Sequence, residues 1–359
     1  MSKKEPQKTP PKQTEQSFQH YLFSQFVTND KRALSNSLEI WESIPKYFLS
    51  PFQIVRLRTK DGLAKPYELS YTFNDTAFSV RIQPALIKQK DGEYKAFFPG
   101  ETEELIEEAL KKILADQNFC IHDPEKHETW VKFSLSMLER ELKARSKTRS
   151  LTQIKHALEI MAGSIITLYK NDQEVWTGSI LQDLFTIDRQ KYLNETDALH
   201  TAKFPLFISH SIDKLEYRQF NFERLMSCSE QLTRWLYKKL INRYKQASAE
   251  NTYHINFSTI QIESGFLQQS RIRDNRRKVI NALDELIHNQ ILTNYKTKEH
   301  KKGKKIVDIT YMFTPSASFI KEQKASNKRT KLALEKLNPT GIIITIPPPK
   351  PPKKPPSKW

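Results

Sequence analysis

Two stretches of the chain repeat one order of predicted secondary-structure elements. The first runs from Trp130 to Tyr169 and the second from Tyr253 to Tyr295, and short matches align them, such as VKFS with INFS and ALE with ALD. Each stretch predicts a short strand, a short helix, a turn, a longer helix and a β-hairpin. This repeat constrains the fold strongly, because one arrangement has to bury the apolar positions of both copies.

A further helix is predicted before each copy, over residues 102–117 and 221–247. Helix, strand, helix, helix and hairpin in this order are typical of a winged helix-turn-helix. We therefore predict the α+β class, with two tandem winged helix-turn-helix domains, a β-rich N-terminal portion and disordered basic tails. The alternating apolar and polar residues at 51–99 predict a β-meander that supplies the β-rich portion.

Composition marks the boundaries of these domains. The N-terminal end is rich in Lys, Gln, Pro and Ser, and the chain closes with IPPPKPPKKPPSKW, which favours disorder and an extended tail. The predicted segments are a disordered tail at 1–35, a first winged-helix domain with the β-rich segment at 36–220, a second winged-helix domain at 221–325 and a Pro/Lys-rich disordered tail at 326–359.

Net charge narrows the class of partner. The chain has 58 Lys and Arg against 41 Asp and Glu, and a net charge of +17 favours nucleic acid or an anionic membrane surface. No apolar run is long enough to span a bilayer and no signal-peptide core is recognisable, so we expect a cytoplasmic protein with no membrane partner. The only two cysteines, Cys120 and Cys228, exclude a disulfide framework and a Cys-rich zinc site.

Residue spacing gives no sign of catalysis. The closest of the eight glycines, Gly92 and Gly100, are too far apart for either GxxxxGK[ST] or GxGxxG. The nine histidines form no HxH pair, and the HDPEKH loop from His122 to His127 is not expected to hold a metal. No nucleophile and base can be paired from spacing alone. We expect no catalytic residues, no metal site, no cofactor and no enzymatic activity.

The longer helix of the second copy lies in RIRDNRRKVINALDELIHNQ, residues 271–290. On a helical wheel its apolar residues gather on one side, and Arg273, Arg277 and Asn281 line the opposite side. Arg can donate two hydrogen bonds to guanine and Asn can pair with adenine, so such a helix can read bases in the major groove. An isolated arginine run is ordinarily a solvated face. The position of this run in the repeat and the net charge favour DNA contact instead.

The hairpin after this helix carries a run of lysines, beginning at Lys296, that suits the phosphate backbone. The predicted principal DNA-binding residues are Arg271, Arg273, Arg276, Arg277, Lys278, Asn281, Lys298, Lys301, Lys302, Lys304 and Lys305.

The first copy carries less charge and more apolar residues. Its longer helix, at 150–163, predicts a secondary DNA contact at Arg145, Lys147, Arg149, Thr152 and His156. Its hairpin contains Ile165, Ile166, Leu168, Val175, Trp176, Ile180 and Leu181. These apolar side chains are equally compatible with packing in the domain's own core and with self-association.

Other charged residues are interpreted as solvated surface. One group comprises the carboxylate pairs Glu103-Glu104 and Glu107-Glu108 in the helix at 102–117. The other group is basic and belongs to the helix at 221–247, namely Arg234, Lys238, Lys239, Arg243 and Lys245.

Three segments resemble plasmid replication initiator (Rep) proteins of the iteron-binding, theta-replication type, which carry tandem winged-helix domains. They are FFPGETEELIEEALKKILA, then LTRWLYKKLINRYKQAS followed by YHINFST, and RIRDNRRKVINALDEL, and the similarity covers residues 80–325. The resemblance implies a bacterial protein, associated with plasmid DNA, that binds repeated double-stranded origin sites, promotes origin opening and recruits host replication proteins such as the replicative helicase. It also implies monomers and dimers, with dimers repressing the initiator's own gene.

In such initiators the second winged helix reads bases, and the first mixes backbone contact with dimerisation. The charge difference between the two copies agrees with that division. Two other classes stay open: a winged-helix transcriptional regulator without a replication role, and a nucleic-acid enzyme such as a primase or relaxase. Direct repeats beside an AT-rich stretch in the neighbouring DNA would favour the initiator, whereas a lone palindrome would favour the regulator.

Overall fold

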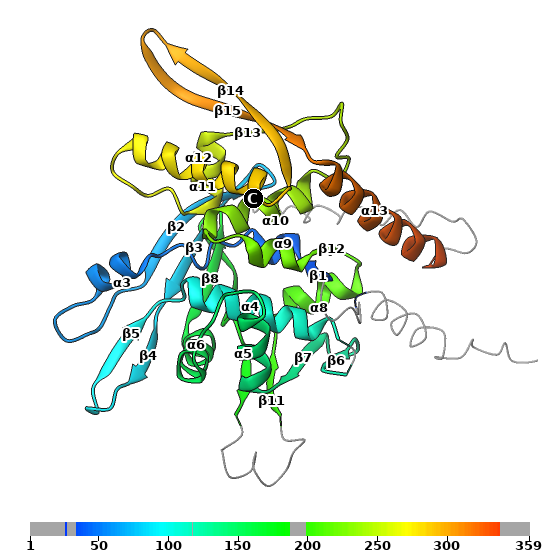
Figure 1. The fold of residues 1–359 in the computed structure, drawn as a ribbon. Coiled ribbons are helices and arrows are strands. Elements are labelled where there is room, and N and C mark those ends of the chain that lie inside the picture. Colours follow the sequence, from blue (N-terminus) through cyan, green and yellow to red (C-terminus); the bar gives the residue numbers. More distant parts are fainter. Residues whose placement is uncertain (1–25, 27–33, 117, 187–198, 338–359) are drawn as a thin grey trace, which may run out of the picture.

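A computed structural model describes residues 26, 34–116, 118–186 and 199–337 and shows a mixed α/β chain (Figure 1). The tail expected at 1–35 lies outside these residues, except for Phe26 and the start of strand β1 (Leu34–Ser37). The stretch 338–359 of the expected C-terminal tail also lies outside them. Within the described ranges, no helix has both the length and the apolar character that a bilayer crossing requires.

Both copies of the repeat contain the expected order of elements. The first copy consists of α4 (Glu101–Leu114), β7 (Glu128–Phe133), α5 (Leu135–Lys143), α6 (Leu151–Gly163), β8 (Ile165–Lys170) and β9 (Gln173–Gly178). The second consists of α10 (Gln231–Arg243), β13 (Tyr253–Asn256), α11 (Phe257–Ser264), α12 (Ile272–His288), β14 (Leu292–Lys302) and β15 (Lys305–Pro315).

The β-rich segment was predicted correctly only in part. Strands β2 (Tyr67–Phe73), β3 (Thr76–Gln83), β4 (Ala85–Lys88) and β5 (Tyr94–Phe97) are present, but residues Pro51–Leu57 form helix α3 instead of a strand. The predicted meander is also wrong, because β4 and β5 pair in a separate two-stranded sheet instead of continuing from β3. Pro51 at the first position of α3 and a capping box between Ser50 and Gln53 start this helix. These local signals outweigh the alternating pattern of the residues that follow.

The sheets distinguish the two copies. In the second copy β13 joins the hairpin, giving the order β13-β15-β14. In the first copy β7 instead pairs with β6 (Cys120–Asp123) and β11 (His200–Lys203), which in turn pairs with β10 (Asp183–Phe185). The first hairpin is extended by the N-terminal strands into the order β2-β3-β8-β9. The β-rich segment therefore covers one edge of the first hairpin, and the second hairpin projects from the body (Figure 1).

A connecting segment links the copies through α8 (Leu206–Asp213), β12 (Arg218–Asn221) and α9 (Phe222–Ser227), with β12 paired to β1. The prediction of a single helix over 221–247 is wrong, because this segment forms two helices, α9 and α10 (Gln231–Arg243), with a non-helical stretch between them. Cys228 is extended there, and the Glu285 carboxylate of α12 accepts hydrogen bonds from the backbone N–H groups of Ser229 and Glu230. A side chain distant in sequence thus supplies the cap that starts α10.

Residues 326–337, which were predicted to belong to the disordered C-terminal tail, are part of helix α13 (Ala317–Leu337). Its inward positions, Phe319, Gln323, Ser326 and Ala333, are buried at helical spacing. The Glu322 carboxylate also accepts hydrogen bonds from the Tyr237 hydroxyl at 2.7 Å and from Arg224 at 3.1 Å. The polar inward side chains hid this helix from a search for apolar periodicity.

Helix α4 is buried on all sides from Glu103 to Leu114. Its apolar face is inward as expected, but the prediction that its carboxylate pairs face solvent is wrong, since all four glutamates are buried. Glu107 accepts a hydrogen bond from the Tyr47 hydroxyl at 2.8 Å and another from the Trp41 indole of α2 (Glu39–Glu42). The N-terminal segment before α3 therefore closes over one side of α4.

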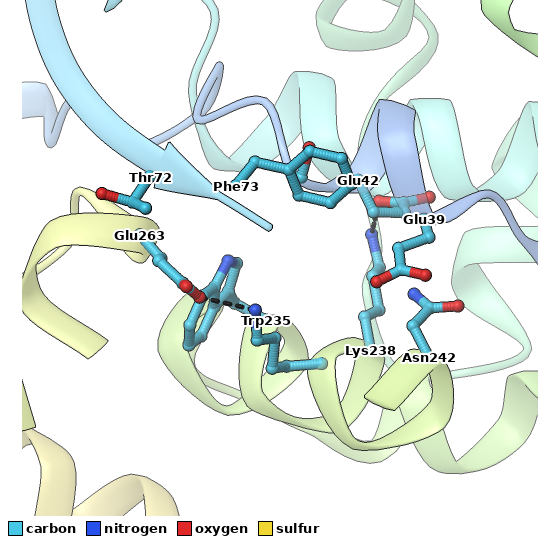
Figure 2. A pocket seen from close by; sticks show the side chains of 10 residues that line it. Glu39, Glu42, Thr72, Phe73, Trp235, Lys238, Asn242 and Glu263 are labelled. Atoms are coloured by element: carbon cyan, nitrogen blue, oxygen red, sulfur yellow. Dashed lines mark hydrogen bonds and ion pairs between the residues drawn. The ribbon is translucent and has the colours of Figure 1, made fainter. Parts of the chain in front are cut away.

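Arg234 and Lys238 of α10 pair with Glu104 and Glu108, so the prediction that the basic residues of this region are solvated is also wrong for most of them. Arg234, which is 0% exposed, donates to the Glu104 carboxylate at 2.9 and 3.2 Å. Lys238 lies 2.5 Å from Glu108 and 2.8 Å from Glu42, and Figure 2 shows it reaching from α10 toward Glu42. Lys239 pairs with Glu263, Arg243 pairs with Glu39, and Lys245 is exposed.

These charges stabilise the fold only as pairs. Burial alone would raise the pKa of the Glu104 carboxyl. Arg234 and Lys238 lower it by more than burial raises it, so the pKa lies below its ordinary value of 4.5. A carboxyl whose pKa is lower in the folded state contributes stability above that ordinary value, and the contribution is lost as the pH falls through the folded pKa.

We predict that Glu104→Gln lowers the free energy of unfolding by about 3–5 kcal/mol at neutral pH, because Arg234 loses its buried anionic partner and is left with the half-exposed Glu101 at 3.1 Å. Denaturant titrations measure this loss, and Glu93→Gln on the exposed β4–β5 turn is the matched control. Stability of the variant should also fall less steeply on acidification below the ordinary pKa. A loss no larger than that of the control would contradict a stabilising role for the pair.

Candidate nucleic-acid interface

Helix α12 separates its residues into a packed and an exposed side. Val279, Ala282, Leu283 and Leu286 are buried against the body, as the helical wheel predicted. Asn275 fixes the start of the helix, because its side-chain amide both donates to and accepts from the backbone of Gln269 at 3.0 Å. The α11–α12 turn and the first turn of α12 are therefore held together.

The predicted DNA-binding residues of α12 lie mainly on its exposed side. Arg271, Arg273, Arg277, Lys278 and Asn281 are exposed. The Arg277 side chain is 72% exposed, and it forms an ion pair with Asp274 on the same helix at 3.5 Å. A cleft of about 400 Å³ borders this side, between α12 and the start of α10. The guanidinium groups are thus presented outward and can meet an anionic ligand.

Arg276 differs from its neighbours, because it is half-buried with its Nε atom inside the protein. Burial raises the pKa of the Tyr311 phenol to about 12, and the nearby Arg276 guanidinium opposes part of that rise. Tyr311 belongs to β15, so Arg276 lies toward the hairpin. Arg276 was predicted to contact DNA together with the exposed residues of α12, but its side chain is not exposed as theirs are.

The hairpin β14–β15 carries the other predicted contacts. Lys298, Lys301, Lys302, Lys304 and Lys305 are all exposed and lie at or near its tip, where Gly303 adopts a φ of +63°. Among these five, Lys301 pairs with a carboxylate, Glu299, at 2.9 Å.

The base of the hairpin is attached to α12. The Tyr295 hydroxyl lies 3.4 Å from Asp284 of α12, and the Tyr295 ring lies 6.5 Å from that of Tyr311. The contact between Tyr295 and Asp284 joins α12 to the base of the hairpin, so the exposed arginines of the helix and the lysines of the hairpin belong to one continuous surface.

Most of the residues predicted for secondary DNA contact in the first copy bind other groups of the same chain. Arg145 pairs with Glu141 and Glu223 at 2.8 Å and lies over the Phe222 ring. Lys147 and Arg149 are half-buried, and they donate to the Cys228 carbonyl at 2.9 Å and to the Thr102 hydroxyl at 3.2 Å. These three side chains hold the turn between α5 and α6 against the rest of the protein.

The other two residues of that set stay on α6. Thr152 is exposed, and the half-buried His156 ring makes an edge-to-face contact with Phe97 at 4.6 Å. The five predicted residues are therefore not presented as one outward surface.

The apolar hairpin of the first copy is mostly core. Ile166, Leu168, Ile180 and Leu181 are buried, which favours the packing alternative for these residues over self-association. Trp176 packs against the rings of Trp41 and Phe207, whereas Val175 remains exposed.

The HDPEKH loop is closed by a carboxylate. His122 and His127 contact the two carboxylate oxygens of Asp213, each at 3.0 Å. Within the part of the chain that the structure describes, no group of three or more His, Cys, Asp or Glu side chains is placed to hold a metal ion.

Sequence reasoning missed one residue of the α12 surface. Ile280 is 42% exposed and lies between the basic and polar residues of the outward side. Its position on the helical wheel could have identified it, but only the polar residues of that side were considered.

No protein-family model and no curated protein sequence matches this chain. Two solved structures of RctB domains 2 and 3 are similar in fold. One has a TM-score of 0.47 at 12% identity and covers 78% of this chain and 98% of its own. The other has a TM-score of 0.44 at 10% identity, covering 75% and 97%.

A third similar structure is that of the Pi initiator protein in complex with iteron DNA. Its TM-score is 0.43 at 14% identity, and the match covers 60% of this chain and 91% of that one. At these identities and TM-scores, none of the three matches assigns a function to this chain.

We predict that replacing Lys301 and Lys304 together by Ala weakens binding to duplex DNA of any sequence. The salt dependence of log K against log salt should flatten by about 2, since each lysine neutralises one phosphate. Fluorescence anisotropy over a salt series measures this slope. Lys324→Ala with Lys328→Ala on α13 removes the same charge from another exposed surface, and this control should keep the parent slope. A parent slope in the hairpin variant would show that the hairpin does not touch phosphate.

Proposed function

We propose that this chain is a plasmid replication initiator. It binds repeated duplex sites at an origin, promotes opening of the adjacent DNA and recruits host replication proteins such as the replicative helicase. It acts in the bacterial cytoplasm on plasmid DNA, and its dimers repress its own gene.

The observation that supports DNA binding is the contrast between basic side chains that are paired inside the protein and basic side chains that are exposed on α12. Arg145, Arg234 and Lys238 are each paired with carboxylates inside the protein. Arg273 and Arg277 are presented outward instead, on a helix whose opposite side is packed and whose start is fixed. Arg can recognise guanine in the major groove with two parallel hydrogen bonds, and a fixed exposed helix gives it the required approach.

The two copies of the repeat are proposed to be winged helix-turn-helix domains, at 36–220 and 221–325. In the second domain, α11 and α12 form the helix-turn-helix and β14–β15 is the wing. The lysines of the wing contact phosphates, while α12 enters the major groove. In the first domain the hairpin belongs to a four-stranded sheet. Arg145, from the turn between α5 and α6 of this domain, pairs with Glu223 inside the protein and is not presented to a ligand. The second domain is therefore the principal reader of DNA.

A role in replication rather than in transcription alone is supported by the three segments that resemble iteron-binding initiators. The test supplies the full chain in trans to a replicon that has the candidate origin and lacks this gene. Maintenance of the replicon is the expected result. Binding to the origin and repression without maintenance would instead identify a transcriptional regulator, and absence of duplex binding would contradict both functions.

We predict that Arg277→Ala weakens specific binding by about 1–3 kcal/mol and removes the preference for one base of the site, because it deletes a two-donor contact to guanine. Competition between the selected duplex and single-base variants measures both effects. Arg140→Ala, at an exposed position of α5, is the control and should retain affinity and base preference. A variant of Arg277 with unchanged preference would remove this residue from base reading.

A further inference from the structure

The outward side of α12 contains one apolar side chain among polar ones. Ile280 follows Arg277 by three residues and precedes Asp284 by four, so it shares their side of the helix. It is 42% exposed, whereas its neighbour Val279 and the nearby Leu283 are fully buried. Ile280 therefore contributes little to the core and is available to a ligand.

The two charged residues that flank Ile280 toward the hairpin are less available than the outward set. Arg276 is half-buried with its Nε atom inside the protein, and Asp284 lies 3.4 Å from the Tyr295 hydroxyl. The contact with Tyr295 ties Asp284 to the base of β14–β15. The outward surface that remains around Ile280 is formed by Arg273, Arg277 and Asn281, which are all exposed.

An isoleucine side chain has no donor or acceptor, so it cannot recognise a base through hydrogen bonds. In the major groove the one apolar group that distinguishes a standard base pair is the 5-methyl group of thymine. Burying Ile280 against that methyl removes apolar surface from water on both sides. We propose that Ile280 reads a thymine 5-methyl group and thereby sets the base preference at one position of the site. This inference rests on the proposed function.

The helix geometry places the thymine close to the base that Arg277 reads. Residues 277 and 280 are separated by about 4.5 Å along the helix axis, at 1.5 Å per residue. Base pairs follow one another at about 3.4 Å. The thymine should therefore lie within about two base pairs of the guanine contacted by Arg277.

The test uses the full chain and a duplex that it selects from a randomised pool. Each thymine of the selected duplex is then replaced singly by deoxyuridine, which removes the 5-methyl group and keeps base pairing and hydrogen-bonding atoms. We expect one position at which deoxyuridine weakens binding about threefold to fivefold, the size expected when one methyl group loses an apolar contact.

The same scan on Ile280→Ala should show no penalty at that position, because the side chain that contacts the methyl group has been removed. Ile280→Gln should shift the preferred base there from thymine to adenine, since Gln pairs with the adenine edge. The matched control is Ile121→Ala on β6, which changes an isoleucine that is 43% exposed outside α12. It should keep the deoxyuridine penalty of the parent chain.

The outcomes separate this inference from the proposed function. If no duplex is enriched, DNA reading itself is contradicted. If a duplex is enriched but deoxyuridine is tolerated at every thymine, or if Ile280→Ala keeps the parent penalty, the assignment of Ile280 is overturned while the proposed function stands.

Discussion

The ion pairs between α4 and α10 are the interaction on which the rest of the structure depends. These helices are the equivalent first helices of the two copies, and they meet through Glu104 with Arg234 and through Glu108 with Lys238. Charged groups at this depth are costly unless each has a close partner. The pairs therefore fix how the two helices face each other, and so they join one copy of the repeat to the other.

The exposed arginines of α12 are not required to position that helix. Glu285 of α12 caps the start of α10, and the tyrosines of the hairpin fix the opposite end of the surface. The helix is thus positioned by its own packed side and by groups near its C-terminal half. A surface ordered before binding loses less conformational freedom when a ligand arrives, which favours affinity and selectivity.

The repeat and its apolar patterns were enough to predict the order of elements in both copies and the packed side of α12. They were insufficient for α4, because amphipathic spacing cannot show whether a carboxylate faces water or a lysine from a distant helix. The break at Cys228 was missed for the same reason, since the cap comes from Glu285. At the candidate site, the exposed Arg273, Arg277 and Asn281 agree with the helical wheel. Arg276 is half-buried instead, and Arg145 in the first copy pairs with Glu223, which is close to it only in the fold.

The central claim is that α12 reads guanine from the major groove, and methylation interference measures this most directly. The selected duplex is methylated sparsely, bound by the full chain, and the bound and free fractions are compared base by base. The account predicts that methylation at guanine N7, in the major groove, blocks binding at one or more positions of each site. Interference confined to adenine N3, in the minor groove, would contradict it.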